Sequence, residues 1–554
     1  MARINFGSMW LSAVVVVAVM ARVISGLTVP KIIQGGMGIR ISNWKLARAV
    51  AEKGELGIVS GTVMDTVLVR ELQDGDEKGD VRRALAAFPD QDMVDRIMDK
   101  YFIMGGKDRN VPYKNLPMWT TDPPQSLLEA TILANFVEVW LAKHDDEGNL
   151  LDGIVGINLL TKVELPNVPS LYGAMLGGVD YVIMGAGIPM QIPGILDCLA
   201  EAKDCSLDIN TQGVEKGQPN PALHFSPKGF WEAAGKPELA KEIDRPAFVP
   251  IVSSVVLAKS MLKRATGKGP TKGIQGFVIE LNTAGGHNAP PRGFRYDPVA
   301  KSHALELDER GQPIYGPKDE VDIEEFAKAI DLPFWFAGSY AKPEKFQEVV
   351  RLGGSGVQVG SLFSLCEESG LLDDVKADIL SQIHEGDLQI FTDPVASPTG
   401  FPFKVLELRG SLSEKSKYEE RPRVCNLGYL RTAYMRDDGK VGYRCPSEPI
   451  KDWLKKGGEI EATEGRKCLC NALAANTGFP QVSPHKKEGE TERYIEEILI
   501  TCGDDVNSAR RFMKQNKETG VWSYPAASVV DYLLSEYEGA ESAVDSEEKA
   551  TVAK

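Results

Sequence analysis

The sequence predicts an α/β protein, a closed (β/α)₈ TIM barrel with insertions and an extra C-terminal region. Short β-branched runs recur eight times along the chain, and each is followed by glycines and then by a helical pattern. Their nearly continuous apolar character is typical of parallel strands covered on both faces. Strand–helix repetition implies right-handed crossovers, so a closed barrel is the most economical arrangement, with an open doubly wound sheet as the alternative. The expected strands are residues 31–34, 56–60, 153–159, 179–184, 247–252, 276–281, 333–337 and 357–360.

Helix start and stop signals lie between these strands. After the first strand, Ser42 is expected to cap a helix whose apolar face runs through residues 44–51, and Gly54 to end it. After the seventh strand, Pro343 suits a first helical turn and Gly353 suits the end of that helix. Both helices therefore fit the crossovers of a barrel.

Two segments exceed a minimal barrel. Residues 61–153, between the second and third strands, contain an apolar stretch at 126–143 that predicts an amphipathic helix, and residues 198–246 precede the fifth strand. Insertions of this kind usually decorate the loops of a barrel. The expected organisation is an N-terminal extension at 1–29, the barrel at 30–400, a cysteine-containing region at 401–535 and an acidic, disordered tail at 536–554.

Charge and chain ends restrict the protein class. The chain has 554 residues with 63 Lys plus Arg and 78 Asp plus Glu, a net charge of −15, which argues against a nucleic-acid groove. The apolar run at residues 9–20 is shorter than the ~20 residues that span a bilayer, and no convincing cleavage site follows it. We expect translation to begin at Met20, and eight cysteines in this length fit a reducing, cytoplasmic compartment.

Glycine-rich turns follow the predicted strands, where a barrel builds its active site. The pairs Gly338-Ser339 and Gly360-Ser361 follow strands seven and eight, where bare backbone N–H groups and a serine hydroxyl can approach a phosphate. No dinucleotide fingerprint or P-loop occurs in the sequence, which leaves a mononucleotide such as FMN open. The other turns are Gln34-Gly35-Gly36-Met37-Gly38, the strand end at Asn158, Gly185-Ala186-Gly187 and the run from Glu280 through Gly285 and Gly286 to Pro291.

His287 stands directly after two glycines at the end of strand six. A histidine there could face the reactive ring of a ligand and exchange a proton near neutral pH. In a Gly/Pro loop the same residue is more often a hydrogen-bonding or surface group.

These motifs carry a family resemblance. IIQGGMG at 32–38, Asn158, AGGH at 284–287 and GVQVGS at 356–361, in this order, resemble the nitronate monooxygenase family, also called 2-nitropropane dioxygenase-like. The resemblance covers roughly residues 30–400. It implies an FMN-containing barrel enzyme in which His287 is the catalytic base. The expected FMN-binding residues are Gly36, Met37, Asn158, Glu280, Gly285, Gly286, Gly338, Ser339, Gln358, Val359, Gly360 and Ser361.

By the same resemblance, the activity is oxidation of alkyl nitronates or nitroalkanes with O₂ to carbonyl compounds and nitrite. Two departures concern the substrate: Glu280 stands where Gln is frequent, and GGHNAPPRG replaces a shorter loop. The alternative is an NAD(P)H-dependent flavin reductase acting on an enoyl thioester or a quinone. A third hypothesis is a catalytically silent barrel that serves as a binding module; the oligomeric state stays open.

Four of the eight cysteines fall close together in the C-terminal region: Cys425, Cys445, Cys468 and Cys470. Converging thiolates could bind zinc or an iron–sulfur cluster. Their spacing is irregular, without paired Cys-x-x-Cys knuckles, so the sequence by itself predicts no metal site.

Overall fold

The computed structural model describes residues 28–267, 272–292, 295–297, 302–487, 490–535 and 537. The predicted N-terminal extension up to residue 27, the expected start at Met20 and most of the acidic tail lie outside the described residues. An eight-stranded parallel sheet forms the centre of the molecule, in the order β1-β13-β12-β9-β8-β4-β3-β2. Its edges meet where Ile33 bridges Leu56 in parallel, so the sheet closes into the predicted barrel.

Each predicted strand is present, and its ends agree with the prediction to within two residues. The barrel strands are β1 (Ile32–Gln34), β2 (Gly57–Ser60), β3 (Val155–Leu160), β4 (Tyr181–Gly185), β8 (Ala247–Val252), β9 (Phe277–Glu280), β12 (Phe334–Ala337) and β13 (Gly356–Val359). Inward-facing side chains such as Ile33, Ile183 and Trp335 fill the cylinder as one buried cluster. The interior is therefore a packed core, and binding space lies at the strand ends.

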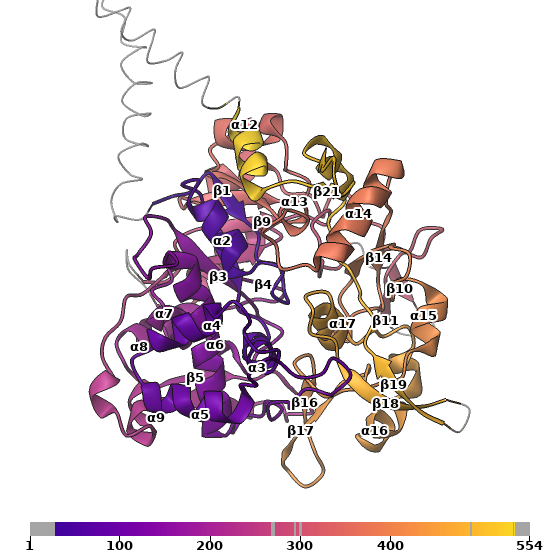
Figure 1. Ribbon diagram of the computed structural model, residues 1–554. Coiled ribbons are helices and arrows are strands. Elements are labelled where there is room, and N and C mark those ends of the chain that lie inside the picture. The colour runs from indigo at the N-terminus through magenta and orange to yellow at the C-terminus, as the bar shows by residue number, and fades with distance from the viewer. Residues whose placement is uncertain are drawn as a thin grey trace, which may run out of the picture.

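Helices on the outside of the barrel connect successive strands (Figure 1). They are α2 (Trp44–Ala51), α6 (Gln125–Lys143), α7 (Asn167–Leu176), α8 (Ile192–Ala200), α10 (Val255–Arg264), α11 (Ile323–Ala329) and α12 (Pro343–Arg351). Pro343 opens α12, and Gly54 and Gly353 follow their helices with positive φ, as predicted.

The expected cap at Ser42 is wrong. Asn43 caps α2, because its side chain accepts a hydrogen bond from the Leu46 N–H. The hydroxyl of Ser42 turns back into the preceding loop, where it donates to the Gly35 carbonyl and accepts from the Met37 N–H. Ser42 therefore stabilises the glycine turn after β1 instead of the helix.

The helix predicted at 126–143 is present, but the prediction that it is amphipathic is wrong. Helix α6 is buried on nearly all sides, including the polar residues Glu129, Asn135 and Glu138. It occupies the crossover between β2 and β3, and the added helices α3 (Met64–Gln73), α4 (Asp80–Ala86) and α5 (Gln91–Tyr101) cover its outer side. The insertion therefore encloses a barrel helix that would otherwise present one face to water.

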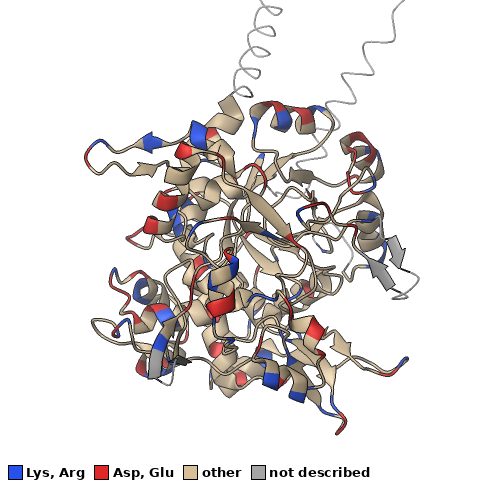
Figure 2. Cartoon of the chain, turned by 90° about the vertical axis from the view of Figure 1, so that its right-hand side faces the viewer, with Lys and Arg blue, Asp and Glu red and all other residues tan. Residues whose placement is uncertain are grey.

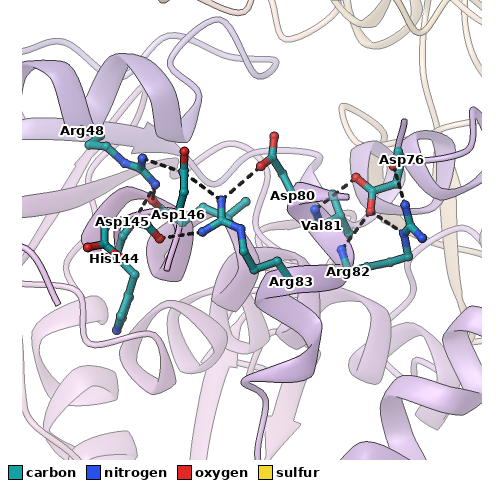
Figure 3. Close-up of polar contacts among 10 residues, drawn as sticks. Arg48, Asp76, Asp80, Val81, Arg82, Arg83, His144, Asp145 and Asp146 are labelled. Atoms are coloured by element: carbon teal, nitrogen blue, oxygen red, sulfur yellow. Dashed lines mark hydrogen bonds and ion pairs between the residues drawn. The ribbon is translucent and has the colours of Figure 1, made fainter. Parts of the chain in front are cut away.

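Polar contacts attach this insertion to the barrel (Figure 3). Arg48 of α2 donates to the His144 carbonyl and pairs with Asp146, while Arg83 of α4 donates to the Asp145 carbonyl at 2.7 Å. Asp76 accepts from the first backbone N–H groups of α4. Half-exposed pairs of this kind contribute little individually, so they fix orientation more than stability.

The second insertion and the C-terminal region meet at a small mixed sheet. β6 (Thr211–Gln212) pairs in parallel with β16 (Thr432–Met435), which pairs with β17 (Val441–Arg444). Other elements of the two segments are β5 (Cys205–Asp208), β7 (Ala222–Phe225), α9 (Pro227–Ala233), η1 (Pro237–Leu239), α15 (Lys415–Glu420), α16 (Ile450–Lys455), η2 (Ile460–Thr463) and α17 (Leu469–Ala475).

The end of the chain returns to the barrel. Residues 526–535 are helical, and Ala526, Val529, Val530 and Leu533 are fully buried in one cluster with side chains of α2 and α12. Figure 1 shows this yellow segment beside α12. The helix therefore covers the outer face between α12 and α2, and residues 360–525 form an excursion from β13.

That excursion contains further short elements. They are α13 (Ser361–Ser364), α14 (Asp373–Glu385), β14 (Ile390–Asp393), β15 (Phe403–Leu406), β18 (Val482–Lys487), β19 (Glu490–Ile495), η3 (Val506–Arg511), β20 (Lys514–Gln515) and β21 (Trp522–Ser523), besides those named above. A separate pair, β10 (Arg295–Asp297) and β11 (Ser302–Ala304), precedes α11. The boundary near residue 401 stays a prediction about folding units.

Among the described residues, none of the helices combines the length and the apolar character needed to cross a bilayer. In Figure 2, the positions of Lys and Arg are interspersed along the ribbon with those of Asp and Glu.

A buried carboxylate connects the C-terminal region to the first insertion. Asp65 of α3 accepts hydrogen bonds from the Tyr429 hydroxyl at 2.5 Å and from the Trp119 indole at 2.9 Å. Asp65 is 1% exposed, so any bond it loses is not replaced by water.

We expect Tyr429→Phe to lower the free energy of unfolding by about 1–3 kcal/mol, because Asp65 would keep its burial and lose a donor. Urea unfolding followed by fluorescence measures the change. Tyr434→Phe is the matched control, since its half-buried hydroxyl makes no hydrogen bond to the described part of the chain. An equal effect of both substitutions would contradict the role of Asp65.

Candidate active site

A cavity of about 210 Å³ opens at the carboxyl ends of the barrel strands. Every residue that the sequence predicts to bind FMN lines this cavity, and so does His287. They come from the ends of β1, β3, β9, β12 and β13, so barrel closure brings together residues more than 320 positions apart in the chain. The structure thus brings the predicted residues together at one cavity, and their roles stay proposals.

The turn after β1 lies against the end of β3. A Cβ added to Gly36 would stand 2.1 Å from the Cβ of Asn158, so only glycine fits there. Gln34 and Ser42 hold the turn in place through hydrogen bonds among themselves and to the Gly35 carbonyl. Glycine at position 36 therefore lets the turn after β1 pack directly against the end of β3.

The turns after β12 and β13 lie beside the turn after β1, since the Gly35 N–H donates to the Val359 carbonyl at 2.7 Å. Gly338 has a φ of 100° and an added Cβ there would meet the Thr283 hydroxyl at 2.7 Å. Ser361, which follows Gly360, accepts a hydrogen bond from the Gly503 N–H at 2.7 Å. Serine and glycine backbone thus converge where the sequence predicts a phosphate.

Asp505 also lines the cavity, next to Ser361. Burial raises the pKa of its carboxyl above the ordinary value, against the opposing effect of its hydrogen bonds. A protonated carboxyl tolerates a neighbouring phosphate, whereas a carboxylate repels it. The burial of Asp505 therefore reduces a conflict that its charge would otherwise create.

His287 is half-buried between the barrel and the C-terminal region. Its Nε2 lies 2.7 Å from the Ser397 hydroxyl, and its ring meets the ring of Phe403 edge to face at 4.9 Å. The neighbouring backbone is fixed as well, because the Lys404 N–H donates to the Gly286 carbonyl and the Gly286 N–H to the Thr501 hydroxyl. Burial, and secondly the charge of Lys162, hold the pKa of His287 well below its ordinary value.

Lys162 and Glu280 form a coupled pair near His287. Burial raises the pKa of Glu280 to about 7, with Lys162 acting in the opposite direction. Burial lowers the pKa of Lys162 to about 7, again opposed by its partner. The Lys162 ammonium lies 3.3 Å from the centre of the Phe401 ring and has no hydrogen-bond partner among the described residues. Both groups can therefore exchange protons near neutrality.

A second cavity, of about 360 Å³, adjoins the first. Ala186, Tyr429 and Leu430 line both, and Lys162 lies in the wall of the second. The second cavity is bounded by the loops after β3 and β4, by Trp119 and Ile209 of the insertions and by β16. The two cavities together provide space for a cofactor and a substrate side by side.

Lys162 and the cavity residues of the C-terminal region were not predicted from the sequence. Lys162 carried a usable signal, since it stands four residues after Asn158 at the rim where a barrel places its chemistry. The C-terminal residues carried none, because no pattern links them to the barrel. They are Phe403, Tyr429, Leu430, Leu469, Cys470, Leu473, Thr501, Cys502, Gly503 and Asp505; Ser397, just before this region, was not predicted either.

No family model matches the sequence, and no curated protein matches it. Similar solved structures include FabK from Thermotoga maritima, at 15% identity and a TM-score of 0.39, covering 94% of this chain and 96% of that one. Nitroalkane oxidase from Streptomyces ansochromogenes aligns at 13% identity and a TM-score of 0.40, covering 94% and 99% of the two chains. The enoyl reductase domain of MlnA from Bacillus amyloliquefaciens aligns at 12% identity and a TM-score of 0.41, covering 94% and 97%.

The lowered pKa of His287 predicts a pH dependence of stability. As the pH falls below 6.5, the unfolded chain binds this proton first, so the stabilising contribution is complete above 6.5 and is lost toward the lower folded-state pKa. We expect His287→Asn to reduce the slope of unfolding free energy against pH in that window, by at most about 1.4 kcal/mol per pH unit. Denaturant unfolding at a series of pH values measures it. The exposed His224→Asn is the control, and an unchanged slope in the His287 variant would contradict the enclosed imidazole.

Proposed function

We propose that this protein is an FMN-dependent oxidoreductase that oxidises alkyl nitronates with O₂ to carbonyl compounds and nitrite. The observation that carries the proposal is the convergence of the glycine turns, Asn158, Gln358 and His287 on one cavity. That combination supplies a surface of bare backbone, a small polar end and one imidazole, which are the parts a flavin site needs.

Several features of the cavity fit FMN. The buried Gln358 side-chain oxygen has no hydrogen-bond partner in the described part of the chain, so it fits a ligand that brings an N–H donor. The backbone around Gly36 would hold the flat ring system, and Gly338, Gly360 and Ser361 would hold the phosphate. FMN, when bound, supplies a two-electron acceptor that O₂ can reoxidise.

The state of His287 favours nitronates over neutral nitroalkanes. When Nε2 carries the ring proton and donates it to Ser397, Nδ1 keeps the lone pair that a base requires. The lowered pKa keeps the imidazole neutral, which a base needs, but it also makes the base weak. An alkyl nitronate has already lost its α-proton, so its oxidation does not depend on the basicity of His287.

The alternative is an NAD(P)H-dependent flavin reductase, and Lys162 with Glu280 favours it. Reduction of an enoyl thioester or a quinone ends with protonation of the substrate. A lysine and a carboxyl whose pKa values are each about 7 are suited to supply that proton. The proposals share the cofactor and differ in what reduces it.

Anaerobic mixing separates these functions. We expect the purified protein to be yellow with about one FMN per chain, and an alkyl nitronate to bleach it rapidly. Faster bleaching by NAD(P)H would favour the reductase, because that donor then reduces the flavin directly. A protein that is colourless and binds no added FMN would support a catalytically silent barrel instead.

The His287→Asn variant is expected to keep its FMN and its turnover of nitronates. Its kcat/KM for the corresponding neutral nitroalkane should fall by about 10²–10⁴-fold, the usual contribution of a positioned base. Steady-state oxygen consumption with both substrates measures the difference, and a flavin spectrum confirms loading. Equal losses with both substrates would remove His287 from the proton-transfer step.

A further inference from the structure

The four cysteines of the C-terminal region come together in the folded chain. Cys425, Cys445, Cys468 and Cys470 all line one small cavity, although they come from three separate segments, two loops and the start of α17. All eight cysteines of the chain are free of disulfides. The irregular spacing of these cysteines in the sequence thus reflects separate segments that return to one cavity.

Two arginines lie near the four thiols. Arg431 lines the cavity, and Arg421 lies close enough to Cys468 to act on it electrostatically. Their positive charges would partly offset the negative charge that four thiolate ligands bring to a metal centre.

The wall of the cavity points to an occupant that accepts hydrogen bonds. Asn426 lines the cavity, and its amide NH₂ group is buried without a partner in the described residues, while its oxygen accepts from Asn471. The rest of the wall is mostly sulfur and apolar side chains such as Leu427 and Leu469, which offer water too few partners. Inorganic sulfide would satisfy the Asn426 donor.

A single ion does not fit the arrangement. Among the described residues, no group of three or more His, Cys, Asp or Glu side chains is placed to hold one metal ion. Zinc requires four sulfurs around one point at ~2.3 Å, whereas an iron–sulfur cluster takes each thiolate on its own corner. Thiols that share a cavity wall without meeting at a point therefore match a cluster better than zinc.

We propose that Cys425, Cys445, Cys468 and Cys470 bind an iron–sulfur cluster beside the barrel cavity. The chain around these cysteines has little regular structure, since its helices and strands from α15 to α17 are at most seven residues long and are joined by loops. A metal centre that joins such loops would stabilise them. Leu430, Leu469 and Cys470 line both cavities, so the cluster would share a wall with the candidate active site.

The full-length protein isolated without oxygen tests the proposal. We expect about two or about four iron atoms per chain with a matching amount of acid-labile sulfide, whether or not FMN is bound. A preparation low in iron is treated anaerobically with ferrous iron and sulfide, and is expected to take up the same amounts. Both assays are independent of flavin content, so failure of the cluster and failure of the flavin proposal remain distinguishable.

Variants locate the cluster. Cys445→Ser and Cys468→Ser should each lose most of the iron and sulfide, while Cys198→Ser, a half-buried free thiol on α8, should retain both. Folding of each variant is checked by circular dichroism and gel filtration. Stoichiometric zinc without sulfide, two disulfides joining the four cysteines, or no iron uptake on reconstitution of the wild-type protein would overturn the proposal.

Discussion

The return of the chain to the barrel determines the composition of the candidate site. Burial of Val529, Val530 and Leu533 against α2 and α12 anchors the final helix on the outside of the cylinder. Each such side chain contributes roughly 1.5–3 kcal/mol by leaving water. β13 ends at the mouth of the barrel, so the chain segment that connects β13 to this helix starts near the mouth. The excursion can therefore supply Ser397, Phe403 and Asp505 to the cavity.

Enclosure by this excursion changes the chemistry of the strand ends. In an open barrel mouth, Lys162, Glu280 and His287 would be solvated and would keep ordinary proton affinities. Burial dominates each of the three shifts, and the charges of neighbours only modify them. The neutral imidazole and the pair that titrates near neutrality thus follow from exclusion of water, to which the C-terminal region contributes through Phe401 and Phe403.

The sequence predicted what depends on local pattern. Apolar runs gave all eight barrel strands, and the glycine turns gave the cavity wall, because both are short-range properties of the chain. The cap at Ser42 failed because its neighbour Asn43 competes for the same backbone donors, while the loop after β1 needs a hydroxyl. The prediction that one face of α6 is exposed is wrong because the helices that cover α6 belong to an insertion. No periodicity in the sequence encodes where an insertion packs. The C-terminal wall residues depend on tertiary contacts, which a pattern of spacing does not contain.

The barrel cavity and the small cavity lined by the four cysteines share a wall at the start of α17. The start of α17 places Leu469 and Cys470 in the wall of the barrel cavity, while Cys468 and Cys470 face the thiol cavity. Residues this close cannot rearrange independently, since a shift of the α17 start moves both walls together. A centre that fixes these thiols would also fix one side of the candidate active site. Loops as long as those between β15 and β18 have few regular hydrogen bonds of their own, so such a fixed point would substitute for the missing secondary structure.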